Sequence, residues 1–147
     1  MEIVVGLHNV TSSQRLLDFA KLAFSLNIKK LLITKVGGTA AQAGIPDVGR
    51  LALKYNKSLI ILPDLKDAVE LFSPSKIYLF SPYAEKEIEP GSIQENSILI
   101  FPGIENGFTK IEQSLGEHVT LRSMKIDVGP IPYASAILYC SINGIKA

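Results

Sequence analysis

Short runs of apolar residues alternate with segments of helical periodicity, and this alternation limits the possible folds more than any other feature of the sequence. The first run, residues 3–7, is continuous and rich in β-branched side chains, which is typical of a strand buried on both faces of a sheet. Six strands are expected, at residues 3–7, 31–36, 58–62, 76–80, 97–101 and 119–126. Because helical segments separate them, we expect an α/β fold with a mostly parallel six-stranded sheet and helices on both faces.

Capping residues lie between several of these runs. Thr11, with Gln14 three residues later, predicts a capping box at the start of the first helix. Asp47 and Asp64 are expected to cap two further helices, since a side-chain oxygen at this position accepts a backbone N–H of the first turn. Pro132 is expected to open the last helix, because proline is favoured in the first helical turn.

Two longer segments show no such periodicity. Residues 39–49 contain glycines and a proline, and residues 81–91 are charged and bounded by prolines, so both are expected to be loops. No other composition change suggests a boundary. A length of 147 residues is ordinary for one domain, and residues 1–147 are expected to form a single domain.

The composition excludes several classes of protein. With 47% hydrophobic and 20% charged residues, the chain has enough apolar material for a core and is not of the disordered class. Its net charge of +1 excludes a polycation or an acidic tail protein, although a local basic patch remains compatible with it. The single cysteine, Cys140, excludes a disulfide framework and fits a reducing environment. Since the sequence shows neither a secretory signal nor an apolar run near the roughly 20 residues of a membrane span, we expect a cytoplasmic protein without membrane contact.

Ligands of open parallel sheets bind beyond the carboxyl ends of the strands. The informative residues should therefore directly follow the predicted strands. These positions are His8-Asn9, Gly37-Gly38, Ser81-Pro82, and residues 102–107 and 127–132.

Residues 101–108 are the most informative of these loops, because two glycines bracket a glutamate directly after a strand. Gly103 permits a close approach of the backbone to a ligand, and Gly107 permits a positive φ. Glu105 can accept hydrogen bonds from a cationic or hydroxyl-bearing group. The alternative is an ordinary turn in which Glu105 lies near a helix start, where the helix dipole favours a carboxylate.

Residues 124–136 form the second informative region. Gly129, Pro130 and Pro132 indicate a stiff loop, and the helix after it is apolar on nearly all faces. A helix with this pattern is buried. In a chain of this size it favours either a dimer interface or a deeply packed core helix.

The third region runs from Asn9 to Arg15. A guanidinium binds phosphate through two parallel hydrogen bonds, so Arg15 is a candidate for a nucleic-acid contact, or else a solvated surface residue. His8 and His118 show no metal-binding spacing. Both are interpreted as structural, and no metal site is predicted.

Taken together, these loops resemble the SPOUT superfamily of knotted RNA methyltransferases, in particular its SpoU-like branch. Asn9 and Arg15 have the six-residue spacing of that branch at the first strand-to-helix junction. Residues 101–108 resemble its Gly-x-Glu motif, although the second glycine comes one residue early. Residues 125–129 and 136–139 resemble in outline its last strand, turn and buried helix. The similarity extends over nearly the whole chain.

This resemblance implies a C-terminal trefoil knot and S-adenosyl-L-methionine (SAM) as cofactor. It also implies a homodimer through the C-terminal helix and the ribose 2′-O methylation of rRNA or tRNA. The residues implied to bind the cofactor are Leu79, Gly103, Ile126 and Gly129. Arg15 and Glu105 are the implied catalytic residues, and Asn9 and Arg15 the implied RNA contacts.

One departure from the family pattern keeps an alternative open. Residues 129–132 are Gly-Pro-Ile-Pro where the branch has Ser-Leu-Asn, whose asparagine assists catalysis in the family. A non-catalytic knotted protein that binds the cofactor or RNA is therefore the first alternative.

A second alternative is a RecB-like, Mg²⁺-dependent nuclease. Such nucleases use a Pro-Asp and a later Asp/Glu-x-Lys to hold the metal. Pro46-Asp47 and Asp64-Leu65-Lys66 match that pattern literally. However, Asp64 is expected at a helix cap, whereas the nuclease motif belongs on a strand.

Overall fold

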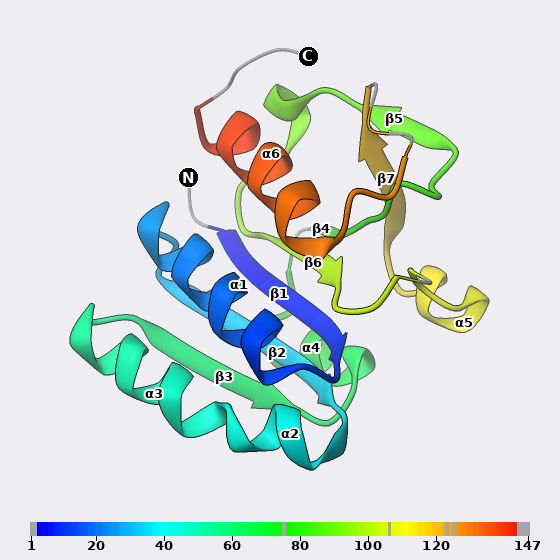
Figure 1. Ribbon diagram of the computed structural model, residues 1–147. Coiled ribbons are helices and arrows are strands. Elements are labelled where there is room, and N and C mark those ends of the chain that lie inside the picture. The colour runs from blue at the N-terminus through cyan, green and yellow to red at the C-terminus, as the bar shows by residue number, and fades with distance from the viewer. Residues whose placement is uncertain (1–2, 75, 106, 123, 125, 144–147) are drawn as a thin grey trace.

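The computed structural model describes residues 3–74, 76–105, 107–122, 124 and 126–143. Its centre is a sheet of seven strands in the order β3-β2-β1-β6-β4-β7-β5, in which every pairing is parallel (Figure 1). The strands are β1 (Ile3–Val10), β2 (Lys30–Val36), β3 (Ser58–Leu62), β4 (Lys76–Phe80), β5 (Lys86–Ile88), β6 (Ser97–Pro102) and β7 (Glu117–Leu121). The predicted α/β fold with a parallel sheet is confirmed.

The predicted number of six strands is wrong, because β5 adds a seventh at the edge of the sheet. This strand is only three residues long, and two of them, Lys86 and Glu87, are charged and exposed. Edge strands are commonly short and charged, since only one side of them is paired. Such a strand contains no apolar run that would reveal it in the sequence.

The helices lie on both faces of the sheet, as predicted. They are α1 (Ser13–Ser25), α2 (Gly38–Ala43), α3 (Ile45–Lys54), α4 (Leu65–Phe72), α5 (Lys110–Gln113) and α6 (Pro130–Asn143), with a 3₁₀ turn, η1 (Pro90–Ser92). Residues of α1, α3 and α6 pack into one hydrophobic cluster with β1 and β6, while α4 packs into a second cluster on the opposite face (Figure 1). Below, these faces are called the α1 face and the α4 face.

The helix caps agree with the sequence at one position and differ at another. Asp64 caps α4 in a capping box with Asp67, as predicted. At α1 the cap is Ser12, whose Oγ accepts the N–H of Arg15, instead of the predicted Thr11. The reason is that β1 continues to Val10, so the chain turns into the helix one residue later than the apolar run suggests.

The prediction of a loop at residues 39–49 is also wrong, since this segment forms α2 and the start of α3. Pro46 lies in the first turn of α3, where its missing N–H has no cost. Gly44 therefore precedes the helix, and Asp47 lies in its first turn instead of capping it.

The C-terminal region differs from the prediction in its boundaries. β7 ends at Leu121, and α6 begins at Pro130, two residues before the predicted Pro132. The predicted helix end near Gly144 lies outside the described residues. α6 buries one side against the sheet, while Tyr139 on the other side is 54% exposed.

In the part of the chain that the structure describes, no helix has the length and apolar character needed to cross a membrane.

Candidate functional site

The sheet has a switch point between β1 and β6. From β1 the chain moves outward to β2 and β3 on one side, and β6, β4, β7 and β5 form the other side. Open parallel sheets bind ligands at such a point, beyond the carboxyl ends of the strands. Four polar side chains gather there on the α4 face. They are His8 at the end of β1, Thr34 on β2, Asp64 after β3, and Glu112 on α5.

His8 is the buried centre of this group and has no exposed surface. Its Nδ1 lies 2.7 Å from Oγ1 of the buried Thr34, and its Nε2 lies 2.6 Å from Oε2 of Glu112. An ionised carboxylate only accepts hydrogen bonds, so Nε2 carries the proton in the pair with Glu112. The Phe108 ring stacks on the imidazole with ring centroids 6.1 Å apart, which closes one side of it. The orientation of His8 is therefore restrained by three neighbours.

Glu112 is ionised at neutral pH for identifiable reasons. Burial raises the pKa of its carboxyl, but hydrogen bonds from the Thr109 N–H and from His8, together with the positive charge of Lys35, outweigh burial and lower the pKa overall. The bond from Thr109 to Oε1 measures 2.9 Å and belongs to the capping box of α5. One side chain thus caps a helix with one oxygen and orients His8 with the other.

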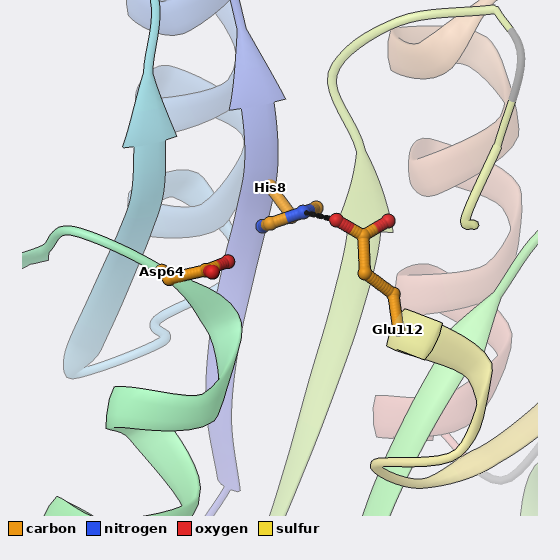
Figure 2. Close-up of side chains that lie close together, drawn as sticks. All are labelled: His8, Asp64 and Glu112. Carbon is orange, nitrogen blue, oxygen red and sulfur yellow. Dashed lines mark hydrogen bonds and ion pairs between the residues drawn. The ribbon is translucent and has the colours of Figure 1, made fainter. Parts of the chain in front are cut away.

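Asp64 completes the cluster, and Figure 2 shows the His8 ring between Asp64 and Glu112. One potential ligand atom from each of the three residues lies within 4.8 Å of the other two. Asp64 is exposed, so the cluster opens to solvent on its side. Both carboxylates lie at the N-terminal ends of helices, where the helix dipole favours negative charge. An imidazole nitrogen with two carboxylates fits a divalent cation, with imidazole favouring transition metals such as Mn²⁺ or Zn²⁺ over Mg²⁺.

Lys35 lies beside this cluster in an unusual backbone conformation. Its φ is 52°. Asn9, at the same level of the neighbouring parallel strand, has a φ of 64°. The ladder of β1 and β2 pairs His8 with Thr34 and then Val10 with Val36, and these two left-handed residues lie between the two pairs. Left-handed backbone is uncommon outside glycine, asparagine and aspartate, and it often marks functional sites.

The predicted residues Asn9, Arg15 and Gly103 also meet at the switch point, but on the α1 face. A guanidinium N–H of Arg15 donates to the Gly103 carbonyl at 2.7 Å. The Gly103 N–H donates to the His8 carbonyl at 2.7 Å. A Cβ at position 103 would lie 2.8 Å from the Asn9 carbonyl oxygen, so the glycine is required by the close approach of two backbone segments.

The other predicted site residues are more dispersed. Glu105 and Gly129 line a cavity of only about 10 Å³ between the loops after β4, β6 and β7. Ile126 is 78% exposed, whereas the Leu79 side chain is completely buried in the core of the sheet and cannot touch a ligand there. Two residues of the motifs quoted above lie outside the described residues, namely Asn106 and Lys125.

The nuclease pattern in the sequence is only partly assembled. Asp47 lies on α3, where it is exposed and forms an ion pair with Arg50. Asp64 does belong to the cluster, but its companions are His8 and Glu112 instead of Asp47. The position of His8 at the end of the first strand was an available signal for a site. Glu112 had none, because 104 residues separate it from His8 in sequence.

Comparison with protein families identifies the relatives of this chain. Residues 38–140 match the family described as RecB-family nuclease (DUF2122). A protein of Aeropyrum pernix named as type II restriction enzyme ApeKORF2002P is 40% identical over 148 aligned residues, which cover 98% of this chain and 95% of the relative. A protein of Methanocaldococcus jannaschii named as type II restriction enzyme MjaORF1200P is 28% identical, with 94% of each chain covered. The chain therefore belongs to the RecB-family nuclease (DUF2122) family.

Solved structures with the same fold come from a different functional class. The SpoU methyltransferase AviRb of Streptomyces viridochromogenes superposes with a TM-score of 0.74 at 10% identity, covering 96% of this chain. This chain spans 58% of AviRb's length. A structure described as giving insight into the 2-OH methylation of C/U34 on tRNA has a TM-score of 0.71 at 14% identity, and the match covers 97% of both chains. At such identities the similarity shows the fold alone.

The predicted SpoU-like fold is thus supported, but the predicted function, a SAM-dependent RNA methyltransferase, is contradicted. The sequence family and both relatives carry nuclease or restriction-enzyme descriptions. The physical reason is that a fold supplies a scaffold, while side chains in the loops decide the chemistry. The Gly-Pro-Ile-Pro at residues 129–132, in place of Ser-Leu-Asn, was the departure in the sequence that agrees with this correction.

Proposed function

We propose that this protein is a nuclease that hydrolyses phosphodiester bonds with a divalent metal ion held by His8, Asp64 and Glu112. The observation that carries the proposal is the convergence of one imidazole and two carboxylates within 4.8 Å at the switch point of the sheet. The family description points to the same chemistry.

The metal supplies one element of this chemistry when bound, the neutralisation of negative charge on the phosphate. The other elements come from the chain. Thr34 and Phe108 hold the His8 ring in place. Lys35, whose positive charge acts on Glu112, attracts the anionic substrate to the opening of the cluster.

Hydrolysis requires a water oxygen to bond to phosphorus while one phosphorus–oxygen ester bond breaks. The attacking water loses a proton, and the leaving oxygen gains one. Asp64 is the exposed member of the cluster, so one of its carboxylate oxygens would hold the metal and the other would take the proton of the attacking water. His8 is buried and hydrogen-bonded on both ring nitrogens. To hold the metal, it would give up one of these bonds: either Nδ1 would part from Thr34, or Nε2 would release its proton and the ion would lie between Nε2 and Glu112.

The direct test measures cleavage of end-labelled single- and double-stranded DNA and RNA with Mn²⁺, with Mg²⁺ and with a chelator. Cleavage is expected with Mn²⁺, and Asp64→Asn and Glu112→Gln are each expected to reduce its rate at least about 100-fold. Glu70→Gln is the matched control, because Glu70 is an exposed carboxylate on α4. Metal-independent cleavage, or full activity in Asp64→Asn, contradicts the proposal.

A second candidate function is the binding of SAM without methyl transfer. It is supported by the TM-score of 0.75 to the structure of AviRb in complex with this cofactor. Gly103, Ile126 and Gly129, with the loop after Leu79, are the proposed contacts. The cavity of about 10 Å³ beside Glu105 would have to widen. Calorimetry with SAM tests the candidate, and binding lost in Gly103→Trp supports it.

Four structural expectations accompany these candidates as proposals. Residues 1–147 form one domain, which should unfold in a single cooperative transition. The C-terminal segment forms the trefoil knot implied by the SpoU-like resemblance, which an experimental electron-density map of the backbone would test.

A homodimer forms through α6, where the exposed Tyr139 offers an apolar contact, so Tyr139→Glu should reduce the mass measured by light scattering. RNA, including rRNA or tRNA, is a candidate partner, with Asn9 and Arg15 as contacts.

A further inference from the structure

A cavity with a volume of about 550 Å³ lies next to the His8 cluster. We propose that this cavity, the Phe108 pocket, binds one unpaired nucleobase of a nucleic-acid substrate. Its volume is within the range of roughly 300–1,000 Å³ that is typical of small-molecule sites. Binding of the base is independent of the proposed function. Only the further step, that the phosphate next to this base lies at the metal cluster, rests on the proposed function.

Phe108 is the wall that the pocket and the cluster share. One part of its ring stacks on His8, and its edge meets the His118 ring with centroids 6.0 Å apart and planes at 88°. His118 lines the pocket. The two imidazoles therefore both contact the same phenyl ring. Gln113, which also lines the pocket, directly follows Glu112 of the cluster. A base in the pocket thus leaves its own backbone phosphate near the cluster.

Tyr83 provides an aromatic surface at the mouth of the pocket. It is 57% exposed, so its ring is accessible to a ligand. Its hydroxyl donates to Asp127 Oδ2 at 3.0 Å, and this bond fixes the ring from its far end. The same bond raises the pKa of Tyr83, so the phenol stays neutral. Bases stack on such exposed and restrained rings irrespective of their sequence.

Polar side chains around the pocket fix its wall or can pair with the edge of a base. Ser81 is completely buried and its Oγ accepts the Tyr83 N–H at 3.1 Å, so it holds the backbone of Tyr83 in place. The Gln113 amide N–H donates to the Phe108 carbonyl at 3.0 Å, which leaves the amide oxygen to accept. Nε2 of His118 has no hydrogen-bond partner among the described residues. Burial lowers the pKa of His118, so the neutral imidazole can donate and accept.

The charges of the pocket favour a neutral base over a phosphate. Its lining contains one cation, Lys86, and one carboxylate, Glu85. Lys86 is moreover paired with Glu117 on β7. A phosphate site needs an excess of positive charge or converging backbone N–H groups. Donors and acceptors of neutral groups beside an aromatic ring instead match the hydrogen-bonding edge and the face of a base.

A pocket for a single base restricts the class of nucleic acid that can bind. In a duplex the face of each base is stacked and its pairing edge is occupied, so a base enters such a pocket only from a single strand or after it is flipped out. The proposed substrate is therefore single-stranded nucleic acid, or an unpaired position within a duplex.

Nuclear magnetic resonance of the imidazole groups can test the proposal, because the chain has only two histidines, His8 and His118. A His118→Gln variant assigns the two sets of signals. In buffer with a chelator, nucleoside 5′-monophosphates should shift the His118 signals saturably. Without chelator, Zn²⁺ should shift those of His8. If Zn²⁺ leaves His8 unchanged while nucleotides still shift His118, the metal site of the proposed function fails and the base pocket stands.

Two variants and a matched control make the assignment specific. Tyr83→Ala and Gln113→Ala should each weaken nucleotide binding about tenfold. Tyr55→Ala removes a ring of similar exposure, 51%, at the end of α3 and should leave binding unchanged. A single-stranded tetranucleotide should bind more tightly than a mononucleotide, and a blunt duplex should not compete.

The proposal is overturned if no nucleoside 5′-monophosphate shifts the His118 signals at millimolar concentration in the folded protein. It is also overturned if free nucleotides bind but the single-stranded tetranucleotide does not, because the pocket then serves a small metabolite. Equal loss of binding in Tyr83→Ala and Tyr55→Ala would show that the nucleotide is not bound at Tyr83.

Discussion

His8 and Asn9 are neighbours in β1, yet they belong to two different polar regions at the same edge of the sheet. On the α4 face, His8 meets Glu112 through side-chain atoms 2.6 Å apart. On the α1 face, Arg15 and Gly103 are joined through a backbone carbonyl. The first region presents ligand atoms that can bind a metal, whereas the second uses its polar groups to hold two loops together. The resemblance in sequence pointed to the second region, and the chemistry of the side chains favours the first.

The difference between the two regions shows how one scaffold can carry unrelated chemistry. Both lie at the switch point between β1 and β6, where the fold itself creates a crevice. The fold therefore determines where a site can be, and the side chains on each face determine what it can do.

The largest effect is expected when the two faces are compared by mutation. His8→Asn should reduce Mn²⁺-dependent cleavage at least about 100-fold, because it removes a ligand atom from the cluster. Arg15→Ala should change the rate at saturating substrate little, since its guanidinium contacts a carbonyl on the other face. Cleavage rates of both variants, with folding checked by circular dichroism, decide the comparison. A greater loss of cleavage rate in Arg15→Ala than in His8→Asn would show that the reaction takes place on the α1 face.

A second experiment sharpens the structural role of the α1 face. Gly103→Ala should destabilise the protein by about 1–3 kcal/mol, because its Cβ would lie 2.8 Å from one backbone atom and 2.9 Å from another. Gly49→Ala is the control, since its Cβ would meet nothing within 4 Å inside α3, and it should stabilise by up to about 1 kcal/mol. Urea unfolding measures both. Equal stability of wild type and Gly103→Ala would contradict the close approach of the two loops.

A smaller effect distinguishes the left-handed residues of the two strands. Lys35→Gly should stabilise the protein by roughly 1 kcal/mol, because glycine relieves the strain at a φ of 52°. Asn9→Gly should stabilise the protein less, since asparagine tolerates this conformation. Thermal unfolding of both variants tests the ranking, and a reversed order would show that contacts of the side chains outweigh backbone strain.

The smallest effect concerns pH. The pKa of Glu112 is lowered in the folded protein, so its contribution to the free energy of unfolding is present above the pKa of the unfolded chain and is lost as pH falls through the folded value. The stability difference between wild type and Glu112→Gln should therefore be larger at pH 7 than at pH 3. Urea unfolding at the two pH values measures it. A difference that does not shrink at low pH would contradict an ionised Glu112.

Much of the fold could be predicted from local sequence because its determinants are local. The apolar runs identified the six longer strands, and Asp64 identified the start of α4. The errors arose where neighbours outside the segment decide. β5 is a strand only because β7 provides a parallel partner, and its own residues are polar. The segment of α2 and α3 looked like a loop because glycine and proline were taken as breaks, although Pro46 lies in the first turn of a helix.

By itself, the sequence determined the alternation of strands and helices and therefore the class of fold. It also identified the positions after the strands, His8-Asn9 among them, as places for a site, although His8 itself was interpreted as structural. Only the tertiary structure decided which of these residues meet. Glu112 reaches His8 across 104 residues of chain because β1 and β6 are adjacent in the sheet and α5 follows β6. Strand order depends on the packing of distant segments, and no local pattern around Glu112 encodes that neighbour.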